Sequence, residues 1–140
     1  MDKLIVALLT WISLQIGVEM PQPPRVRLVT QRELVELAYG KSAPEGVSVK
    51  AMYQRKSKTV HLSEAWRPDS LEDRGILLHE LVHHVQEVAG LSYPCIAARE
   101  ALAYHLQAQW LKENGVDDPY ALMDVDEFTI AVRSMCPESE

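Results

Sequence analysis

The sequence predicts an α+β fold in a single domain. Three observations indicate this class: an apolar segment near the N-terminus has helical spacing, three short segments alternate apolar and polar residues, and two long helical patterns follow them. A chain of 140 residues has the usual length of one domain and can bury a core without the help of disulfides or metals. We therefore expect residues 1–140 to form one domain.

Residues 4–18 have two interpretations. Apolar residues recur there at helical spacing, at Leu4, Ile5, Leu8, Leu9, Ile12 and Ile16, which favours a first helix packed in the core. The same stretch follows Lys3 and resembles a secretory signal, although small residues are not well placed for cleavage. It is too short and too often interrupted by polar residues to be a stable membrane span. We expect a core helix, with an uncleaved or poorly marked signal as the alternative.

The next part of the chain alternates strands and a short helix. Residues 25–29 alternate after a proline-rich break and predict a strand. Thr30 is typical of a helix N-cap, with Glu33 three residues later, and Gly40 is a typical stop. Residues 47–53 and 59–62 alternate on either side of a polar turn and predict a hairpin.

Two long helices and a helical tail complete the predicted fold. Ser70 is the expected N-cap of the first long helix, which ends near Gly90. The second long helix is expected from about residue 96 to residue 114, where Gly115 closes it. Short helices are expected at residues 119–123 and 127–134.

Charge and cysteine content limit the functional classes. The net charge is -6 and the basic residues form no run, so we expect no nucleic-acid partner. The two cysteines, Cys95 and Cys136, can form one disulfide or remain buried thiols. A disulfide would favour a periplasmic or secreted protein, because disulfides persist in oxidising compartments.

The segment His79-Glu80-Leu81-Val82-His83 carries the clearest chemical signal. It lies within a long helical pattern, and residues four apart on a helix share a face, so His79 and His83 can direct two imidazoles at one cation. Glu80 is not spaced to bind the same ion, but it can accept a proton from a water molecule as a general base. The alternative is a core helix with coincidental histidines, although burying them without a partner would be costly.

A catalytic zinc site needs a third protein ligand, and Glu100 on the next helix is the best candidate. Its neighbours include small alanines that allow two helices to approach closely, and the turn after Gly90 lets the second helix fold back on the first. The alternative for Glu100 is a solvated charge or a partner for Arg99. We therefore expect one zinc ion per chain, bound by His79, His83 and Glu100.

Other residues are weaker candidates for metal ligands. His105 faces a different side of its helix from Glu100, and His84 is expected in a supporting or solvent-exposed position. Glu87 lies too far along the helix to bind the metal but can orient a ligand. His61 is expected to be a hydrogen-bonded strand residue, and Cys95 is an unlikely thiolate ligand.

Tyr104 lies one helical turn after Glu100 and is the second predicted catalytic residue. It can donate a hydrogen bond to an oxyanion or to a ligand carboxylate, and the alternative is a packed tyrosine with its hydroxyl at the surface. Gln107 is a further candidate on the same side of the helix.

The segment His79-Glu80-Leu81-Val82-His83, followed by Glu100, resembles the gluzincin clan of zincin metallopeptidases, and most of all its compact members, the minigluzincins. The chain is also similar to an uncharacterised family of small bacterial domains that share the His-Glu-Leu-Val-His-His segment, an Arg-Glu-Ala-Leu-Ala-Tyr helix and two cysteines. This likeness extends from the first helix to Cys136. One departure is that gluzincins often have an acidic residue where Ala103 and Tyr104 stand, which leaves the support of the first histidine unassigned.

The resemblance implies a zincin-like fold, in which a small mixed sheet packs on the N-terminal helix, the active-site helix and a second long helix. It implies His79, His83 and Glu100 as ligands and Glu80 as the base. It also implies that the edge strand at residues 47–53 lines the cleft, where a peptide can pair with its backbone. The expected function is zinc-dependent hydrolysis of peptide bonds in a peptide or protein substrate. The alternatives are a catalytically silent zinc-binding interaction module and a helical domain without metal.

Overall fold

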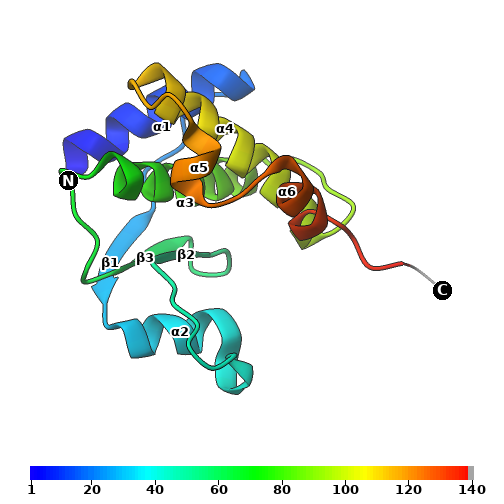
Figure 1. Ribbon diagram of the computed structural model, residues 1–140. Helices are drawn as coiled ribbons and strands as arrows, with labels where there is room; N and C mark the ends of the chain where they lie inside the picture. The colour runs from blue at the N-terminus through cyan, green and yellow to red at the C-terminus, as the bar shows by residue number, and fades with distance from the viewer. Residues whose placement is uncertain (139–140) are drawn as a thin grey trace.

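The computed structural model describes residues 1–138 and has an α+β fold (Figure 1). The elements are, in chain order, α1 (Asp2–Ile16), β1 (Arg25–Val29), α2 (Gln31–Tyr39), the 3₁₀ helix η1 (Gly40–Ser42), β2 (Ala51–Gln54), β3 (Thr59–Ser63), α3 (Leu71–Val88), the 3₁₀ helix η2 (Ile96–Arg99), α4 (Glu100–Glu113), α5 (Pro119–Met123) and α6 (Glu127–Arg133). The order of helices and strands is the order that the sequence predicts.

The sheet has three strands in the order β1-β3-β2. Central strand β3 pairs parallel with β1 and antiparallel with β2, so the sheet is mixed and β2 forms one of its edges. All five residues of β3 are buried, as expected for a strand that has neighbours on both sides and helices on both faces.

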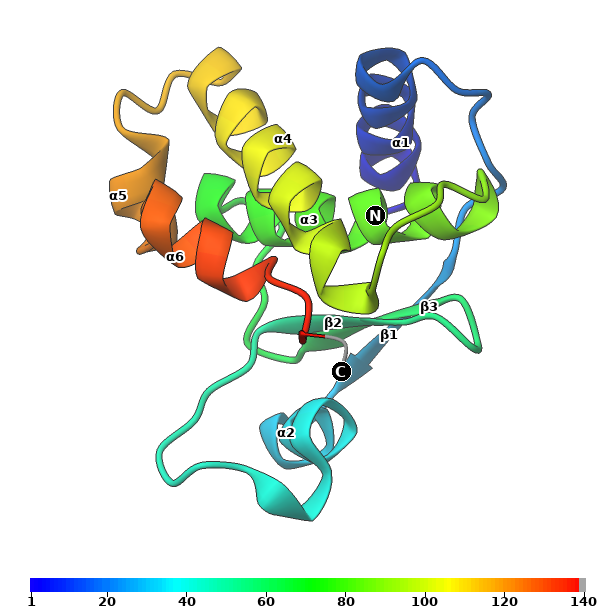
Figure 2. The same cartoon turned by 90° about the vertical axis from the view of Figure 1, so that its right-hand side faces the viewer.

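The helices lie in layers around this sheet. Helix α3 packs on one face, and α1 and α4 pack on the far side of α3, while α2 covers the opposite face (Figure 2). Helices α5 and α6 lie beside α4. Helix α3 therefore lies in the middle of the fold, in contact with the sheet and with both of its long helical neighbours.

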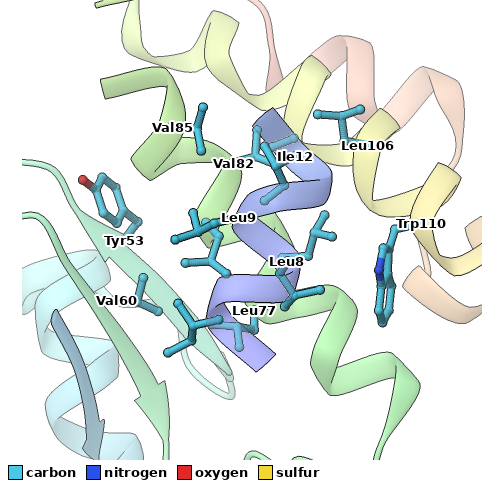
Figure 3. Close-up of a cluster of buried hydrophobic side chains, with 14 of the residues drawn as sticks. Leu8, Leu9, Ile12, Tyr53, Val60, Leu77, Val82, Val85, Leu106 and Trp110 are labelled. Atoms are coloured by element: carbon cyan, nitrogen blue, oxygen red, sulfur yellow. The ribbon is translucent and has the colours of Figure 1, made fainter. Parts of the chain in front are cut away.

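Helix α1 contributes to the core, as the first interpretation of residues 4–18 predicts. Its side chains Leu8, Leu9 and Ile12 face those of α3 and α4 (Figure 3). Leu9 and Ile12 are completely buried. Among residues 1–138, no helix is both long enough and apolar enough to cross a membrane.

The predicted helix caps are confirmed. The Thr30 hydroxyl accepts a hydrogen bond from the Glu33 amide at 3.2 Å, and the Ser70 hydroxyl accepts one from the Asp73 amide at 3.1 Å. Gly90 follows the end of α3 with a φ of 67°, a conformation that favours glycine.

Two predicted boundaries were wrong. Residues 47–50 are not part of the strand, because the side-chain amide of Gln31 bonds both the N–H and the C=O of Val49 at 2.7 Å and so replaces a strand partner. The second long helix does not begin as an α-helix at residue 96. Residues 96–99 form the 3₁₀ helix η2, and Glu100 is the first residue of α4.

Cys95 and Cys136 form a disulfide, with their α-carbons 5.8 Å apart. The bond joins the start of η2 to the segment that follows α6, two places 41 residues apart in the sequence. It therefore anchors the C-terminal segment to the region from which α4 begins.

Replacing Cys136 by serine should destabilise the fold. Opening a loop of this length should lower the free energy of unfolding by roughly 2–4 kcal/mol, because the unfolded chain regains conformational freedom. Urea denaturation of the wild type and the variant measures the difference. The double variant Cys95→Ser/Cys136→Ser is the control: it should match the single variant and be insensitive to reductant. Equal stability of the oxidised and reduced wild type would contradict the prediction.

Candidate metal centre

The three predicted ligands lie together at the contact between α3 and α4. The Glu100 carboxylate lies between the two imidazoles: Oε2 is 3.0 Å from His79 Nε2, and Oε1 is 2.8 Å from His83 Nε2. One donor atom from each residue lies within 4.8 Å of the other two, so the group can hold a metal ion. Both histidines are buried, while Glu100 is 31% exposed and borders a cavity.

Two glutamines bind the other ring nitrogens. Gln107 Oε1 lies 2.9 Å from His79 Nδ1, and Gln86 Oε1 lies 2.8 Å from His83 Nδ1. The orientation of the Gln86 amide follows from its own contacts, because its Nε2 donates to the Arg99 carbonyl, which can only accept. His83 Nδ1 therefore carries a proton, and its Nε2 presents a lone pair to Glu100.

This arrangement fits a cation. Lone pairs of neutral imidazoles and oxygens of a carboxylate repel one another at 2.8–3.0 Å unless a proton or a metal ion lies between them. Two imidazoles and one carboxylate form a donor set that suits the later first-row transition metals. Hydrogen bonding of the second ring nitrogen is the usual way in which a protein orients such a ligand.

The same contacts shift the proton affinities of the metal-free site. Burial by itself would lower the pKa of His83, but the hydrogen bond to Glu100 and the charges of Glu80 and Glu100 outweigh it and raise the pKa. Burial would raise the pKa of Glu100, but the hydrogen bonds from His79 and His83 outweigh it and hold the pKa far below its usual range. Both shifts have the same physical cause, the close contact between the imidazole of His83 and the carboxylate of Glu100.

Glu80 lies beside the three ligands without joining them. Its Oε1 accepts a hydrogen bond from the backbone N–H of Tyr53 at 2.9 Å, which links α3 to edge strand β2. Its Oε2 has no hydrogen-bond partner within residues 1–138, and Glu80 borders the same cavities as Glu100. One oxygen of Glu80 is thus held in place while the other is available to a molecule in the cavity.

Tyr104 packs its ring against His79, with the ring centroids 4.5 Å apart. Its hydroxyl accepts a hydrogen bond from Arg133 Nη1 at 2.8 Å. Burial is the main cause that raises the pKa of Tyr104, so the hydroxyl keeps its proton at neutral pH and can donate it. Tyr104 therefore borders the cavity beside the ligands, where its hydroxyl can act as a donor. It is not simply a packed tyrosine with its hydroxyl at the protein surface.

The site opens into a cleft formed by two adjoining cavities of about 660 and 420 Å³. Both are lined by Tyr39, Val49, Ala51, His79, Glu80, Glu100 and Tyr104, so they form one continuous space along β2. We call this space the cleft, its larger part the Arg133 end and its smaller part the Arg99 end. No segment among residues 1–138 plugs it at the ligands.

Of the two positions expected for His84, the structure excludes the solvent-exposed one, because the side chain is 2% exposed. Instead, the Tyr53 hydroxyl donates to its Nδ1 at 2.8 Å, and its Nε2 donates to the Gln22 carbonyl at 2.7 Å. Burial is the main cause that raises the pKa of Tyr53 to about 12 and lowers that of His84, so both stay neutral and hold β2 beside α3.

The remaining alternatives for metal ligands lie elsewhere. His105 is partly exposed and pairs with Glu127, and His61 is a buried strand residue bonded to Gln54, as expected. Glu87 orients no ligand, because it pairs with the two arginines Arg55 and Arg99 instead.

The sequence analysis missed two residues that shape the site. Gln86 lies three positions after His83 on the same helix, and this spacing was a usable signal. Arg133 had no such signal, because 29 residues separate it from Tyr104 and the whole of α5 lies between them in the sequence. Gln107 had been noted only as a further candidate, and the structure assigns it to His79.

Comparison with known proteins identifies the family. The family described as "Domain of unknown function (DUF6647)" matches residues 1–140. The chain belongs to this family. No curated protein and no solved structure matches the chain. Membership of DUF6647 thus assigns no activity, and the function is argued from the geometry of the site.

Replacing Gln107 by leucine should weaken metal binding by roughly 10–100-fold, the usual effect of removing a residue that orients a ligand. Gln107 makes its one side-chain hydrogen bond within residues 1–138 to His79, so the variant isolates that contact. Competition with a chromophoric chelator measures the affinity. Gln109→Leu, on the exposed side of the same helix, is the matched control and should bind as the wild type does. Equal affinity of the two variants would show that Gln107 does not support the site.

Metal affinity should also fall on acidification, beginning above the ordinary histidine pKa of 6.5. The raised pKa of His83 means that a proton competes for the Nε2 lone pair at a higher pH than in a free imidazole. The affinity for the metal is therefore highest above the pKa of His83 and falls as the pH drops through that pKa. Chelator competition from about pH 8 to about pH 5.5 measures the profile. A constant affinity over this range would contradict the assignment of His83 as a ligand.

Proposed function

We propose that the chain is a zinc-dependent peptidase with a zincin-like fold. The observation that carries the proposal is the convergence of His79, His83 and Glu100 on one point, with Glu80 beside them and not among them. A donor set of two histidines and one glutamate is typical of catalytic zinc, where a fourth position stays open. The cleft in front of these residues supports a catalytic role over a purely structural one.

The residues have distinct roles in this proposal. His79, His83 and Glu100 would hold zinc, which, when bound, acidifies a water molecule and polarises a carbonyl group. Glu80 accepts the proton of the attacking water on Oε2 and then delivers it to the leaving amine. The hydrogen bond from Tyr53 to Oε1 keeps this carboxylate aimed into the cleft.

Tyr104 is proposed to stabilise the developing oxyanion. Its hydroxyl retains a proton to donate, because burial raises its pKa and outweighs the opposite effect of the hydrogen bond from Arg133. The positive charge of Arg133 beside it strengthens Tyr104 as a donor to negative charge.

A peptide is the substrate that suits the cleft best. Edge strand β2 runs along it, and a strand edge offers backbone groups with which an extended chain can pair. The resemblance to gluzincins agrees with this choice. Gluzincins often have an acidic residue that orients the first histidine, where this chain has Ala103 and Tyr104. Here Gln107 bonds His79 and can take that role.

A silent zinc-binding module is the second candidate. The observation that favours it is the hydrogen bond from the Tyr53 backbone N–H to Glu80, since it occupies one of the two oxygens that a general base would use. For either function, the Cys95–Cys136 disulfide is the reason to propose an extracytoplasmic location.

Two variants separate zinc binding from catalysis. Glu80→Gln keeps the size of the side chain and an oxygen that accepts from Tyr53, but it removes the base. It should retain one zinc per chain, while hydrolysis of a broad peptide library falls by roughly 10²–10⁴-fold. His79→Ala should lose zinc and activity together, because two remaining ligands hold zinc poorly.

Elemental analysis and peptide mass spectrometry provide the two measurements. Hydrolysis by Glu80→Gln at the wild-type rate would contradict the mechanism. A wild type that binds one zinc and cleaves no peptide would favour the silent module. A wild type without zinc would contradict both candidates.

A further inference from the structure

The two ends of the cleft differ in how their cationic side chains are paired. At the Arg99 end, Arg55 and Arg99 share the carboxylate of Glu87, at 2.9 and 3.3 Å, which offsets part of their charge. At the Arg133 end, Lys50 is paired with Asp73 at 2.8 Å. Arg133 is different: within residues 1–138 no carboxylate lies within 4.0 Å of its guanidinium group.

Arg133 borders the 660 Å³ cavity, and its one hydrogen bond to the described residues is donated by Nη1 to Tyr104. Nε and Nη2 therefore keep their N–H donors for a further partner. A guanidinium group presents its donors in a planar fork that matches the two oxygens of a carboxylate.

Tyr104 adds a second donor at the same place. Because its oxygen accepts from Arg133, its proton is directed elsewhere and is available to a group in the cavity. Both donors stand on elements held in place: Tyr104 packs on His79, and Arg133 ends α6, three residues before the disulfide at Cys136.

We propose that Arg133, with Tyr104, binds a carboxylate of the peptide substrate at this end of the cleft. The inference rests on the proposed function, because it takes the ligand to be a peptide, whose anionic groups are carboxylates. The carboxylate is either the side chain of Asp or Glu or the C-terminus of the peptide.

Binding to Glu80→Gln tests this inference without turnover. The probes are short acetylated peptides in matched pairs, with Asp or Asn at each position in turn and with a C-terminal acid or amide. Isothermal titration calorimetry gives the affinities. The protein should bind one class of carboxylate peptide roughly three- to tenfold more tightly than its neutral partner, the range expected of a partly exposed ion pair. The difference should shrink at high salt.

The variants are made in the Glu80→Gln protein. Arg133→Met should weaken the binding of carboxylate peptides more than that of their neutral partners and so abolish the preference, while Arg133→Lys should retain part of the preference. Arg32→Met is the matched control, because it makes the same change of charge at an exposed site that borders no part of the cleft, and it should keep the preference.

The outcomes separate this inference from the proposed function. A preference for Asp peptides or for free C-termini identifies the source of the carboxylate and supports the inference, even if the wild type hydrolyses none of the peptides. If the wild type hydrolyses peptides but no carboxylate preference is found in binding, the inference is overturned and the proposed function stands. Equal weakening of acidic and neutral peptides by Arg133→Met would mean that Arg133 only positions Tyr104, and would overturn it. If no peptide binds at all, the inference is also overturned. The proposed function is then tested separately, by whether the wild type hydrolyses peptides.

Discussion

The site depends on the position of one carboxylate between two imidazoles. Glu100 lies within 3.0 Å of both His79 Nε2 and His83 Nε2, at the first residue of α4. Two lone pairs at such distances repel each other, so each of these contacts needs a proton or a metal ion between its two atoms. The close approach of α3 and α4 holds the carboxylate there. At Gly75 a β-carbon would lie only 3.2 Å from the Leu111 side chain, so the two helices leave little room for a larger residue.

The surrounding polar groups support this arrangement from both sides. Gln86 and Gln107 fix the imidazoles from behind, while the amide of Tyr53 fixes Glu80 from the edge strand. The pair formed by Tyr53 and His84 then attaches β2 to α3. Apart from the bond between Gln86 and His83, which lies within α3, each of these bonds connects α3 to another element. The central helix of the fold therefore also organises the chemistry. The disulfide extends the same support to the C-terminal segment that carries Arg133.

The sequence predicted those features that depend on local spacing. The caps at Thr30 and Ser70 and the order of elements follow from such patterns. The pairing of Cys95 with Cys136 follows from their number and not from spacing, because the chain has two cysteines. Contacts between distant segments were not predictable. The Gln31 side chain, which ends the strand early at Val49, acts across 18 residues, and Arg133 reaches Tyr104 across 29. The partner of His84 was not predictable either, because Tyr53 lies 31 residues away in the sequence.

X-ray absorption spectroscopy at the zinc edge tests the central claim most directly. The account predicts that the purified protein, given one equivalent of zinc, binds it through nitrogen and oxygen donors at about 2.0–2.2 Å, with the scattering signature of two imidazoles. A spectrum with sulfur at about 2.3 Å, with fewer than two imidazoles, or with the features of hydrated zinc free in solution would contradict it.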